Sequence, residues 1–391
     1  MDMYNFIFHN PTKIYFGDNQ LCHLGEELKQ YGTRVLLTYG GGSIKRVGLY
    51  DKVTAELKKA GLTVYELPGI EPNPRHTTVN KGAEICKKEK IDVLLAVGGG
   101  STIDCAKAIA AAAFYEGDSW DLVTHKAPVI KALPIVTIVT IAATGSEMNN
   151  VAVISNMEIN EKLGLHHPLL RPKVSFLDPT NTYSVNAFQT ACGAVDIMSH
   201  VFDFFYFVKG KKMDMVDRLM EEVLKTVVKY APIALKEPQN YEARANLMWA
   251  ATWGLNRFLE TGINQAPSCH RMEHELSAYY DIAHGLGLAI LIPRWLKYIL
   301  DDSTAPQIKR FGVNVLGIDG SLSDREGANR AIEALGDFFF KTLGLQSTFT
   351  EIGIDDKNFK VMAHKACRGD VMPGYKPLTP KDVENIFRMC L

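Results

Sequence analysis

The sequence predicts a two-domain protein, in which an α/β domain with a parallel sheet is followed by an all-helical domain. Strand-like and helix-like stretches alternate from about residue 33 to residue 180, as in a parallel sheet covered by helices. After about residue 185 the strand patterns fade and long helical patterns dominate. A chain of 391 residues is long enough for two domains. We therefore expect an α/β domain over 1–184 and a helical domain over 185–391.

The individual elements follow from hydrophobic periodicity and from turn residues. Two short strands are expected within 5–16, interrupted at Asn10-Pro11, and a helix over 18–32 with Asp18 as its N-cap. Further strands are expected at 33–39, 63–69, 91–97, 134–142 and 173–178. Helices are expected between them at 47–61, in the second part of 71–90, and at 102–115. In the second domain, helices are expected at 188–208, 213–234, 240–260, 268–280, 286–300, 327–343 and 380–390.

The composition is that of an ordinary globular protein, with 47% hydrophobic and 22% charged residues. A net charge of −1 provides no global field for nucleic acid or anionic membranes. The seven cysteines are dispersed and form no C-x-x-C pair, which is typical of a reducing compartment. The N-terminus lacks a signal-peptide pattern, and no run of 18 apolar residues occurs. We expect a soluble, cytoplasmic protein.

Two glycine-rich loops directly follow predicted strands. Gly98-Gly99-Gly100-Ser101 lies between a buried strand and a helix, and Gly40-Gly41-Gly42-Ser43 ends the first strand of the alternating region. Glycines let a backbone approach a pyrophosphate closely, and strand ends at one edge of a parallel sheet are where ligands bind. Two such loops suit a dinucleotide, whereas a tight strand–helix turn without a ligand is the structural alternative. Thr140 and Thr144-Gly145-Ser146-Glu147 end the next strand, and they either add donors or cap the loop.

A candidate metal site lies in the second domain. Asp196 and His200 are four residues apart, as are His270 and His274, so each pair shares one face of a predicted helix. His284 follows in the loop-like stretch DIAHGLG. One carboxylate and several imidazoles suit Fe²⁺ or Zn²⁺. The alternative is that these side chains form polar helix faces and a turn.

Five stretches then establish a family resemblance: VGGGSTIDCAK, IVTIAATGSEMNN, VSFLDPTNTYS, CGAVDIMSH and CHRMEHELSAYYDIAHG. In this order they resemble the signatures of the iron-containing (group III) alcohol dehydrogenases, and most nearly the branch of butanol dehydrogenases and broad-range aldehyde reductases. The resemblance spans almost the whole chain. It implies a dehydroquinate-synthase-like N-terminal α/β domain, a helical C-terminal domain and an active site in the cleft between them. Ala142 stands where proline is usual, and Asn186 stands near a usual proline before the first ligand helix; both departures alter loop stiffness more than chemistry.

The resemblance also implies roles for individual residues. The family's metal ligands correspond to Asp196, His200, His270 and His284, and His274 corresponds to a histidine that lines the site without binding metal. The cofactor contacts correspond to Gly40, Gly41, Ser43, Asn73, Gly98, Gly99, Gly100, Ser101, Asp104, Thr140, Thr144, Asn149, Lys162 and Leu177.

The expected activity is metal-dependent, NAD(P)-linked hydride transfer between nicotinamide and a primary alcohol or aldehyde such as butanol or butanal. Alternatives are a polyol oxidoreductase like glycerol dehydrogenase and a nucleotide-binding sensor without catalysis. Fe²⁺ is the family expectation, Zn²⁺ also suits the ligands, and a homodimer is expected by family analogy. NADP(H) is favoured over NAD(H), because no acidic residue follows the strand ending at Tyr39 before Asp51, whereas Lys45 and Arg46 lie close behind Ser43. These two cations are alternatively solvated residues at a helix start.

Overall fold

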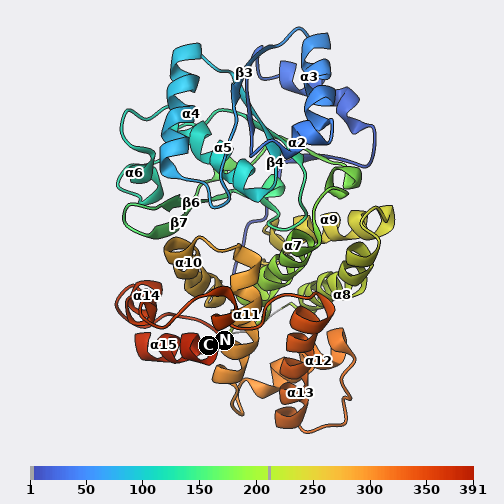
Figure 1. The fold of residues 1–391 in the computed structure, drawn as a ribbon, viewed down its shortest axis with the longest axis vertical. Helices are drawn as coiled ribbons and strands as arrows, with labels where there is room; N and C mark the ends of the chain where they lie inside the picture. Colours follow the sequence, from blue (N-terminus) through green and yellow to red (C-terminus); the bar gives the residue numbers. More distant parts are fainter. Residues whose placement is uncertain (1–3, 210–212) are drawn as a thin grey trace. The chain divides into compact units, whose positions relative to one another are not determined.

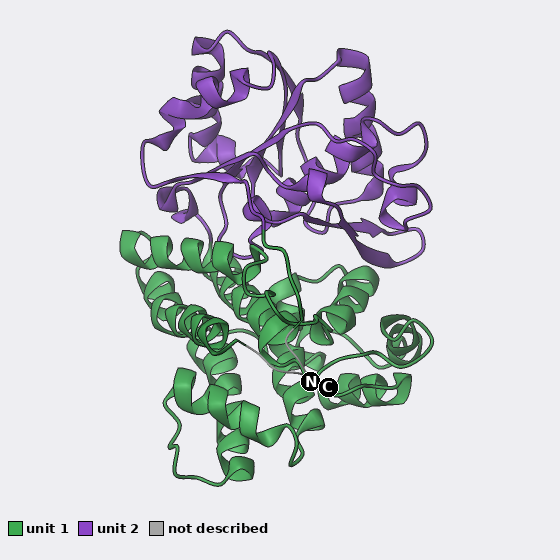
Figure 2. Ribbon diagram, turned by 180° about the vertical axis from the view of Figure 1, so that it is seen from behind, with its two compact units in different colours: residues 1–8, 186–391 green, residues 9–185 purple. Residues whose placement is uncertain are grey.

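The computed structural model describes residues 4–209 and 213–391, so the first three residues of the N-terminal stretch considered above lie outside the described residues. The chain forms two compact units, shown in Figure 2. One is His9–Val185, and the other is Asn186–Leu391 together with the segment that ends at Phe8. The N-terminal segment was expected in the α/β domain instead. It groups with the helical unit because the Tyr4 N–H donates to the Gly262 carbonyl and Phe8 packs edge-on against Phe258.

A six-stranded parallel sheet forms the centre of the unit His9–Val185 (Figure 1). Its strand order is β1-β8-β5-β4-β2-β3. The strands are β1 (Lys13–Phe16), β2 (Arg34–Tyr39), β3 (Thr63–Leu67), β4 (Val93–Gly98), β5 (Ile135–Val139) and β8 (Val174–Leu177). Because β8, β5, β4 and β2 are consecutive neighbours and parallel, their carboxyl ends lie along one edge of the sheet.

Alternate side chains of the central strands enter two separate hydrophobic cores. Leu36 and Leu94 pack on one face with apolar residues of α4 (His76–Glu89), α5 (Gly100–Ala112) and α6 (Ser119–Val123). Val35 and Leu95 pack on the other face with α1 (Leu24–Lys29), α2 (Ser43–Arg46) and α3 (Leu49–Lys59). The predicted α/β class is confirmed, and the continuous apolar strands reflect burial on both faces.

Several local predictions for this unit were wrong. Only Lys13–Phe16 of the stretch 5–16 is a strand, because that segment alone pairs with β8. The region 18–32 is a 3₁₀ turn (Gln20–His23) followed by the short α1, and Asp18 provides no cap. An unpredicted antiparallel hairpin joins β6 (Val151–Asn156) to β7 (Glu161–His166). Its turn contains no glycine, and Asn160 adopts the left-handed conformation (φ 49°) that asparagine tolerates.

The unit that begins at Asn186 is helical over most of its length, as predicted. Its helices are α7 (Ala187–His200), α8 (Asp214–Lys236), α9 (Tyr241–Leu255), α10 (Cys269–Tyr280), α11 (His284–Ile299), α12 (Ala305–Leu316), α13 (Asp324–Asp337), α14 (Phe359–Ala366) and α15 (Pro380–Met389). The helices α12 and α14 were not predicted, and π-helical turns continue α7 and α13 at Val201–Tyr206 and Phe338–Thr342. His284 begins α11 and does not lie in a loop. No helix among the described residues is long and apolar enough to cross a bilayer.

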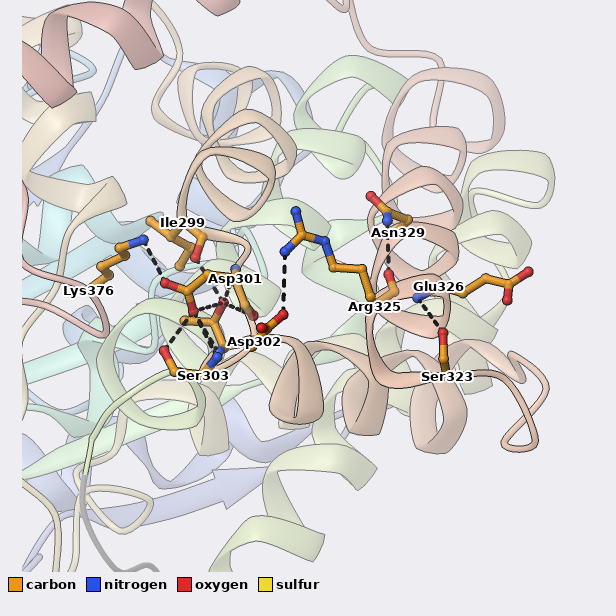
Figure 3. Close-up of polar contacts among 10 residues, drawn as sticks. Ile299, Asp301, Asp302, Ser303, Ser323, Arg325, Glu326, Asn329 and Lys376 are labelled. Carbon is orange, nitrogen blue, oxygen red and sulfur yellow. Dashed lines mark hydrogen bonds and ion pairs between the residues drawn. The ribbon is translucent and has the colours of Figure 1, made fainter.

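The connection between α11 and α12 is held by one aspartate, as Figure 3 shows. Asp301 accepts the Ser303 N–H at 2.9 Å and the Lys376 ammonium at 2.7 Å. These bonds lower the pKa of the Asp301 carboxyl, most strongly the one from Lys376. The interaction ties the loop before α15 to the end of α11, the helix that begins with His284.

Candidate metal and nucleotide sites

The helix α7 presents Asp196 and His200 on one buried face. Its start is fixed by the N-cap residue Asn186, whose side chain accepts the Gln189 N–H at 2.8 Å. The four-residue spacing then brings His200 Nε2 to 3.7 Å from Asp196 Oδ1. Both side chains are buried, which is costly for polar groups without compensating interactions.

The helices α10 and α11 bring the other histidines to the same place. Both α7 and α10 pack beside α11 (Figure 1). Nε2 of His284 lies 3.7 Å from the same Oδ1 of Asp196 that His200 approaches. One ligand atom each of Asp196, His270 and His284 lies within 4.8 Å of the others. The ring centroids of His200 and His270 are 5.0 Å apart. The structure thus brings together the four residues predicted from sequence as ligands.

A close approach of backbone to backbone sets the position of His284. A Cβ atom on Gly285 would lie 2.1 Å from the Cys192 carbonyl oxygen. Only glycine therefore lets the first turn of α11 approach α7 this closely. Since Cys192 lies one turn before Asp196, the contact fixes the separation of Asp196 and His284.

Asp203 orients His270, a role that the sequence analysis missed. Its carboxylate accepts the backbone N–H groups of Ser268, Cys269 and His270 at 2.7, 3.0 and 2.7 Å. The same carboxylate lies 2.9 Å from His270 Nδ1. A carboxylate acceptor at Nδ1 places the proton there and leaves Nε2 with its lone pair. Nε2 of His270 is buried and has no hydrogen-bond partner within the described chain, so it is chemically suited to bind a metal ion.

The electrostatic environment keeps His200 neutral. Burial lowers the pKa of His200 well below its usual value, and the neighbouring His270 lowers it further. Metal ions bind the neutral form of imidazole. The donor set of one carboxylate and neutral imidazoles therefore fits a divalent ion of the Fe²⁺ or Zn²⁺ type.

His274 lies at the edge of this cluster, one helical turn after His270. The ring centroid of His274 is 6.5 Å from that of His270 and 5.8 Å from that of His284. Its side chain is partly exposed, whereas His270 is buried. A second grouping of possible ligand atoms contains Glu273, His274 and His284. Partial exposure beside the ligand cluster suits a group that contacts substrate or cofactor.

Predicted cofactor residues in the unit His9–Val185 gather at the carboxyl edge of the sheet. Gly40 follows β2, Gly98 ends β4, Thr140 follows β5 and Leu177 ends β8. The Thr140 N–H donates to the Gly98 carbonyl at 3.1 Å. A Cβ atom on Gly100 would meet the side chain of Thr144 at 2.4 Å. The glycine loop 98–101 and the loop after β5 are therefore in direct contact. Gly99 is the N-cap of α5, and Ser101 lies in the first turn of that helix.

A buried network holds three other predicted cofactor residues. Asp104 accepts the Ser146 hydroxyl at 2.5 Å and the Val153 N–H at 2.9 Å, while Asn149 Oδ1 accepts the Lys107 ammonium at 2.9 Å. Burial raises the pKa of the Asp104 carboxyl, and the nearby ammonium groups of Lys107 and of the buried Lys162 lower it in part. These contacts favour a structural role for Asp104 and Asn149, which tie the hairpin and the loop after β5 to α5.

Lys107 completes this network and was not singled out from the sequence. Its fully buried ammonium donates to Ser146 Oγ, Asn149 Oδ1 and the Val151 carbonyl at 2.8–2.9 Å. Burial lowers its pKa to about 7. Asp104 and Lys107 lie one turn apart on α5, and this spacing is the signal that could have placed Lys107 near the Asp104 carboxylate.

The loop after β2 is exposed and lacks a carboxylate. Gly41 and Ser43 are exposed, and a Cβ atom on Gly41 would meet no atom within 4 Å. Lys45 Nζ lies 4.5 Å above the Tyr50 ring, so this cation is already engaged within its own unit. Arg46 is exposed. Asn73, after β3, adopts a left-handed backbone conformation with φ 54°.

Comparisons with known proteins show which family this fold and sequence belong to. Residues 11–179 match the family described as iron-containing alcohol dehydrogenase, and residues 190–391 match the C-terminal region of the Fe-containing alcohol dehydrogenase family. The chain belongs to the iron-containing alcohol dehydrogenase family. The resemblance noted from the sequence motifs is thereby confirmed, and the chain is an oxidoreductase that acts on alcohols.

Individual relatives of this alcohol dehydrogenase match it over 93% or more of its length. The NADH-dependent butanol dehydrogenase A of Clostridium acetobutylicum is 49% identical, and the match covers 99% of each chain. The NADPH-dependent aldehyde reductase YqhD of Escherichia coli is 38% identical, with 93% of each chain covered. The crystal structure of NADH-dependent butanol dehydrogenase A from Thermotoga maritima superposes with a TM-score of 0.94 at 40% identity, covering 100% of this chain and 99% of that one.

The family and these relatives place the chain in the butanol dehydrogenase and aldehyde reductase branch. Its activity is that of an NAD(P)-linked alcohol dehydrogenase or aldehyde reductase. A metal ion and a nicotinamide cofactor follow from membership of the family. Asp203, which lies outside the expected motifs, orients His270 within the ligand cluster.

Proposed function

We propose that the protein interconverts a primary alcohol and its aldehyde, such as butanol and butanal, at a mononuclear metal centre formed by Asp196, His200, His270 and His284. The observation that supports this proposal most is the position of Asp196 Oδ1, which lies 3.7 Å from the Nε2 atoms of both His200 and His284. Nε2 of His270, which has no hydrogen-bond partner among the described residues, supports the same use.

The chemistry follows from this set of groups. Asp196, His200, His270 and His284 would hold a divalent ion, which would supply Lewis-acid polarisation of a carbonyl oxygen, and a bound nicotinamide would supply or accept the hydride. Asp203 keeps the His270 lone pair directed at the centre. Partly exposed His274 orients the substrate or nicotinamide, or relays the alcohol proton.

For the cofactor we propose binding along the carboxyl edge of the sheet, with the pyrophosphate on the loop 98–101 and the adenosine end at Gly40, Gly41 and Ser43. Preference for NADP(H) over NAD(H) is supported by the lack of a carboxylate after β2 before Asp51. Lys45 and Arg46 are both exposed, and Arg46 is the cation we propose for a 2′-phosphate, because the Lys45 ammonium packs on the Tyr50 ring. The names of relatives include NADH-dependent and NADPH-dependent enzymes, so kinetics must decide.

The test is a steady-state assay with a panel of straight-chain aldehydes, after metal-free protein has been reloaded with Fe²⁺ or Zn²⁺. Butanal should be reduced with either cofactor, and kcat/KM should be higher with NADPH. Glycerol and other polyols serve as control substrates and should be oxidised far more slowly than butanol. Reduction of no aldehyde with either reloaded metal contradicts the proposed function, and a higher kcat/KM with NADH contradicts the cofactor preference alone.

We also propose that the enzyme is a cytoplasmic homodimer. All seven cysteines are free thiols, which fits a reducing compartment. The homodimer rests on family analogy. Light scattering coupled to size-exclusion chromatography should give a mass near twice 43.4 kDa, and a mass of one chain would contradict it.

A further inference from the structure

Glu273 is a charged residue inside the helical unit whose surroundings are unusual. Its side chain is fully buried. It lies on α10 between His270 and His274, but the mechanism above gives it no part. Burying a carboxylate is costly unless hydrogen bonds and positive charge compensate it. The partners that compensate the buried Glu273 carboxylate therefore indicate what this residue does.

The partners of Glu273 are specific. Oε1 accepts the hydroxyl of Ser277, one turn later on α10, at 2.5 Å. Oε2 contacts Nδ1 of His284, the first residue of α11. Gly287 makes room for this arrangement, since a Cβ atom there would lie 2.9 Å from Glu273 Cγ. Residues of α10 and α11 thus surround the Glu273 carboxylate, which contacts one imidazole nitrogen.

The other nitrogen of this imidazole faces the ligand cluster. Nε2 of His284 lies 3.7 Å from Asp196 Oδ1. A carboxylate that accepts the Nδ1 proton leaves the lone pair on Nε2, directed at Asp196. A lone pair and a carboxylate oxygen that face each other at this distance suit a cation bound between them. Glu273 therefore acts on His284 as Asp203 acts on His270.

From this geometry we infer that Glu273, held by Ser277, is a positioning residue that fixes the tautomer and ring orientation of His284 for metal binding. The inference rests on the proposed metal centre and deepens it. Glu273 acts through His284 and touches neither metal nor substrate. Its removal should weaken metal binding about 10- to 100-fold, the usual effect of losing such a partner.

The experiment measures metal binding independently of turnover. Metal-free wild type, Glu273→Gln, Glu273→Ala and Ser277→Ala are titrated with Zn²⁺ against a competing chelator. The Co²⁺-loaded forms are compared by visible absorption, which reports ligand geometry. Glu275→Gln is the matched control, because Glu275 lies on the same helix but its carboxylate faces Lys365 at 3.8 Å.

Glu273→Ala should raise the Zn²⁺ dissociation constant 10- to 100-fold and alter the Co²⁺ spectrum. Glu273→Gln should have a smaller effect on both quantities, and Ser277→Ala should have the smallest effect. Glu275→Gln should match wild type. Dissociation constants within threefold of wild type and unchanged Co²⁺ spectra in both Glu273 variants would overturn the inference. If Glu273→Ala does not fold, the isosteric Glu273→Gln decides. Failure of wild type itself to bind one ion would instead contradict the proposed metal centre.

Discussion

The Asp203 carboxylate lies 2.9 Å from His270 Nδ1 and also accepts the His270 backbone N–H at 2.7 Å. One side chain therefore starts the helix α10 and orients its first histidine. Because the same carboxylate binds the helix start and the His270 ring, the stability of the helical unit is coupled to the geometry of the candidate metal site.

Substituting Asp203 should separate these two roles. Asp203→Ala leaves three buried N–H groups without an acceptor, and each costs about 1–3 kcal/mol, so we expect a loss of at least about 3 kcal/mol in the free energy of unfolding. Asp203→Asn retains an acceptor oxygen and should lose about 1 kcal/mol, with metal affinity about tenfold weaker. Urea unfolding of the metal-free proteins measures the change in the free energy of unfolding, and competition with a chelator measures the change in metal affinity. Equal stability of Asp203→Ala and wild type would contradict this account.

Gly285 tests the contact between α7 and α11. Gly285→Ala places a Cβ atom 2.1 Å from the Cys192 carbonyl oxygen, so a helix must shift. Such overpacking typically costs about 1–3 kcal/mol. We also expect weaker metal binding, because the shift changes the distance from Asp196 to His284. Thermal unfolding and Zn²⁺ titration measure both effects.

The control for this substitution is Gly254→Ala in α9. The nearest atoms to its Cβ would belong to Ile197 at 3.6 Å, an ordinary contact. Replacing a helical glycine by alanine should leave stability unchanged or raise it by up to about 1 kcal/mol. Similar behaviour of the two variants would show that the approach to Cys192 does not constrain the fold.

His274→Ala distinguishes a group that lines the site from a metal ligand. We expect the variant to retain one metal ion per chain, because Asp196, His200, His270 and His284 remain. Its kcat should fall about 10²- to 10⁴-fold if the imidazole transfers a proton, and less if it only orients substrate. Elemental analysis combined with steady-state kinetics makes the distinction. An empty metal site in this variant would make His274 a ligand.

The sequence predicted those features that depend on local spacing and regular periodicity. Pairs four residues apart, such as Asp196 and His200, placed their side chains on one helix face, and apolar runs located the central strands. What it missed depended on tertiary contacts or on atypical turns. Asn160 replaces the usual glycine in the hairpin turn. Asp203 and Glu273 acquire their roles only when α10 and α11 pack against their neighbours.

The cofactor preference can be tested by restoring a carboxylate after β2. Gly41→Asp fits without steric conflict, since a Cβ atom there meets nothing within 4 Å. The added charge should repel a 2′-phosphate and lower the NADPH/NADH ratio of kcat/KM at least tenfold, about 1.4 kcal/mol. The neutral, isosteric Gly41→Asn is the control. Equal NADPH/NADH ratios of kcat/KM in the Gly41→Asp and Gly41→Asn variants would show that the 2′-phosphate does not bind near Gly41.

The most direct test of the account is the metal content and butanal reductase activity of His270→Ala beside wild type. Both proteins are stripped, reloaded with Fe²⁺ or Zn²⁺ and analysed for bound metal, with circular dichroism to verify the fold. Wild type should hold one ion per chain and reduce butanal, whereas folded His270→Ala should lose both the ion and the activity. Full activity of His270→Ala in a metal-free preparation would contradict the metal site and the mechanism based on it.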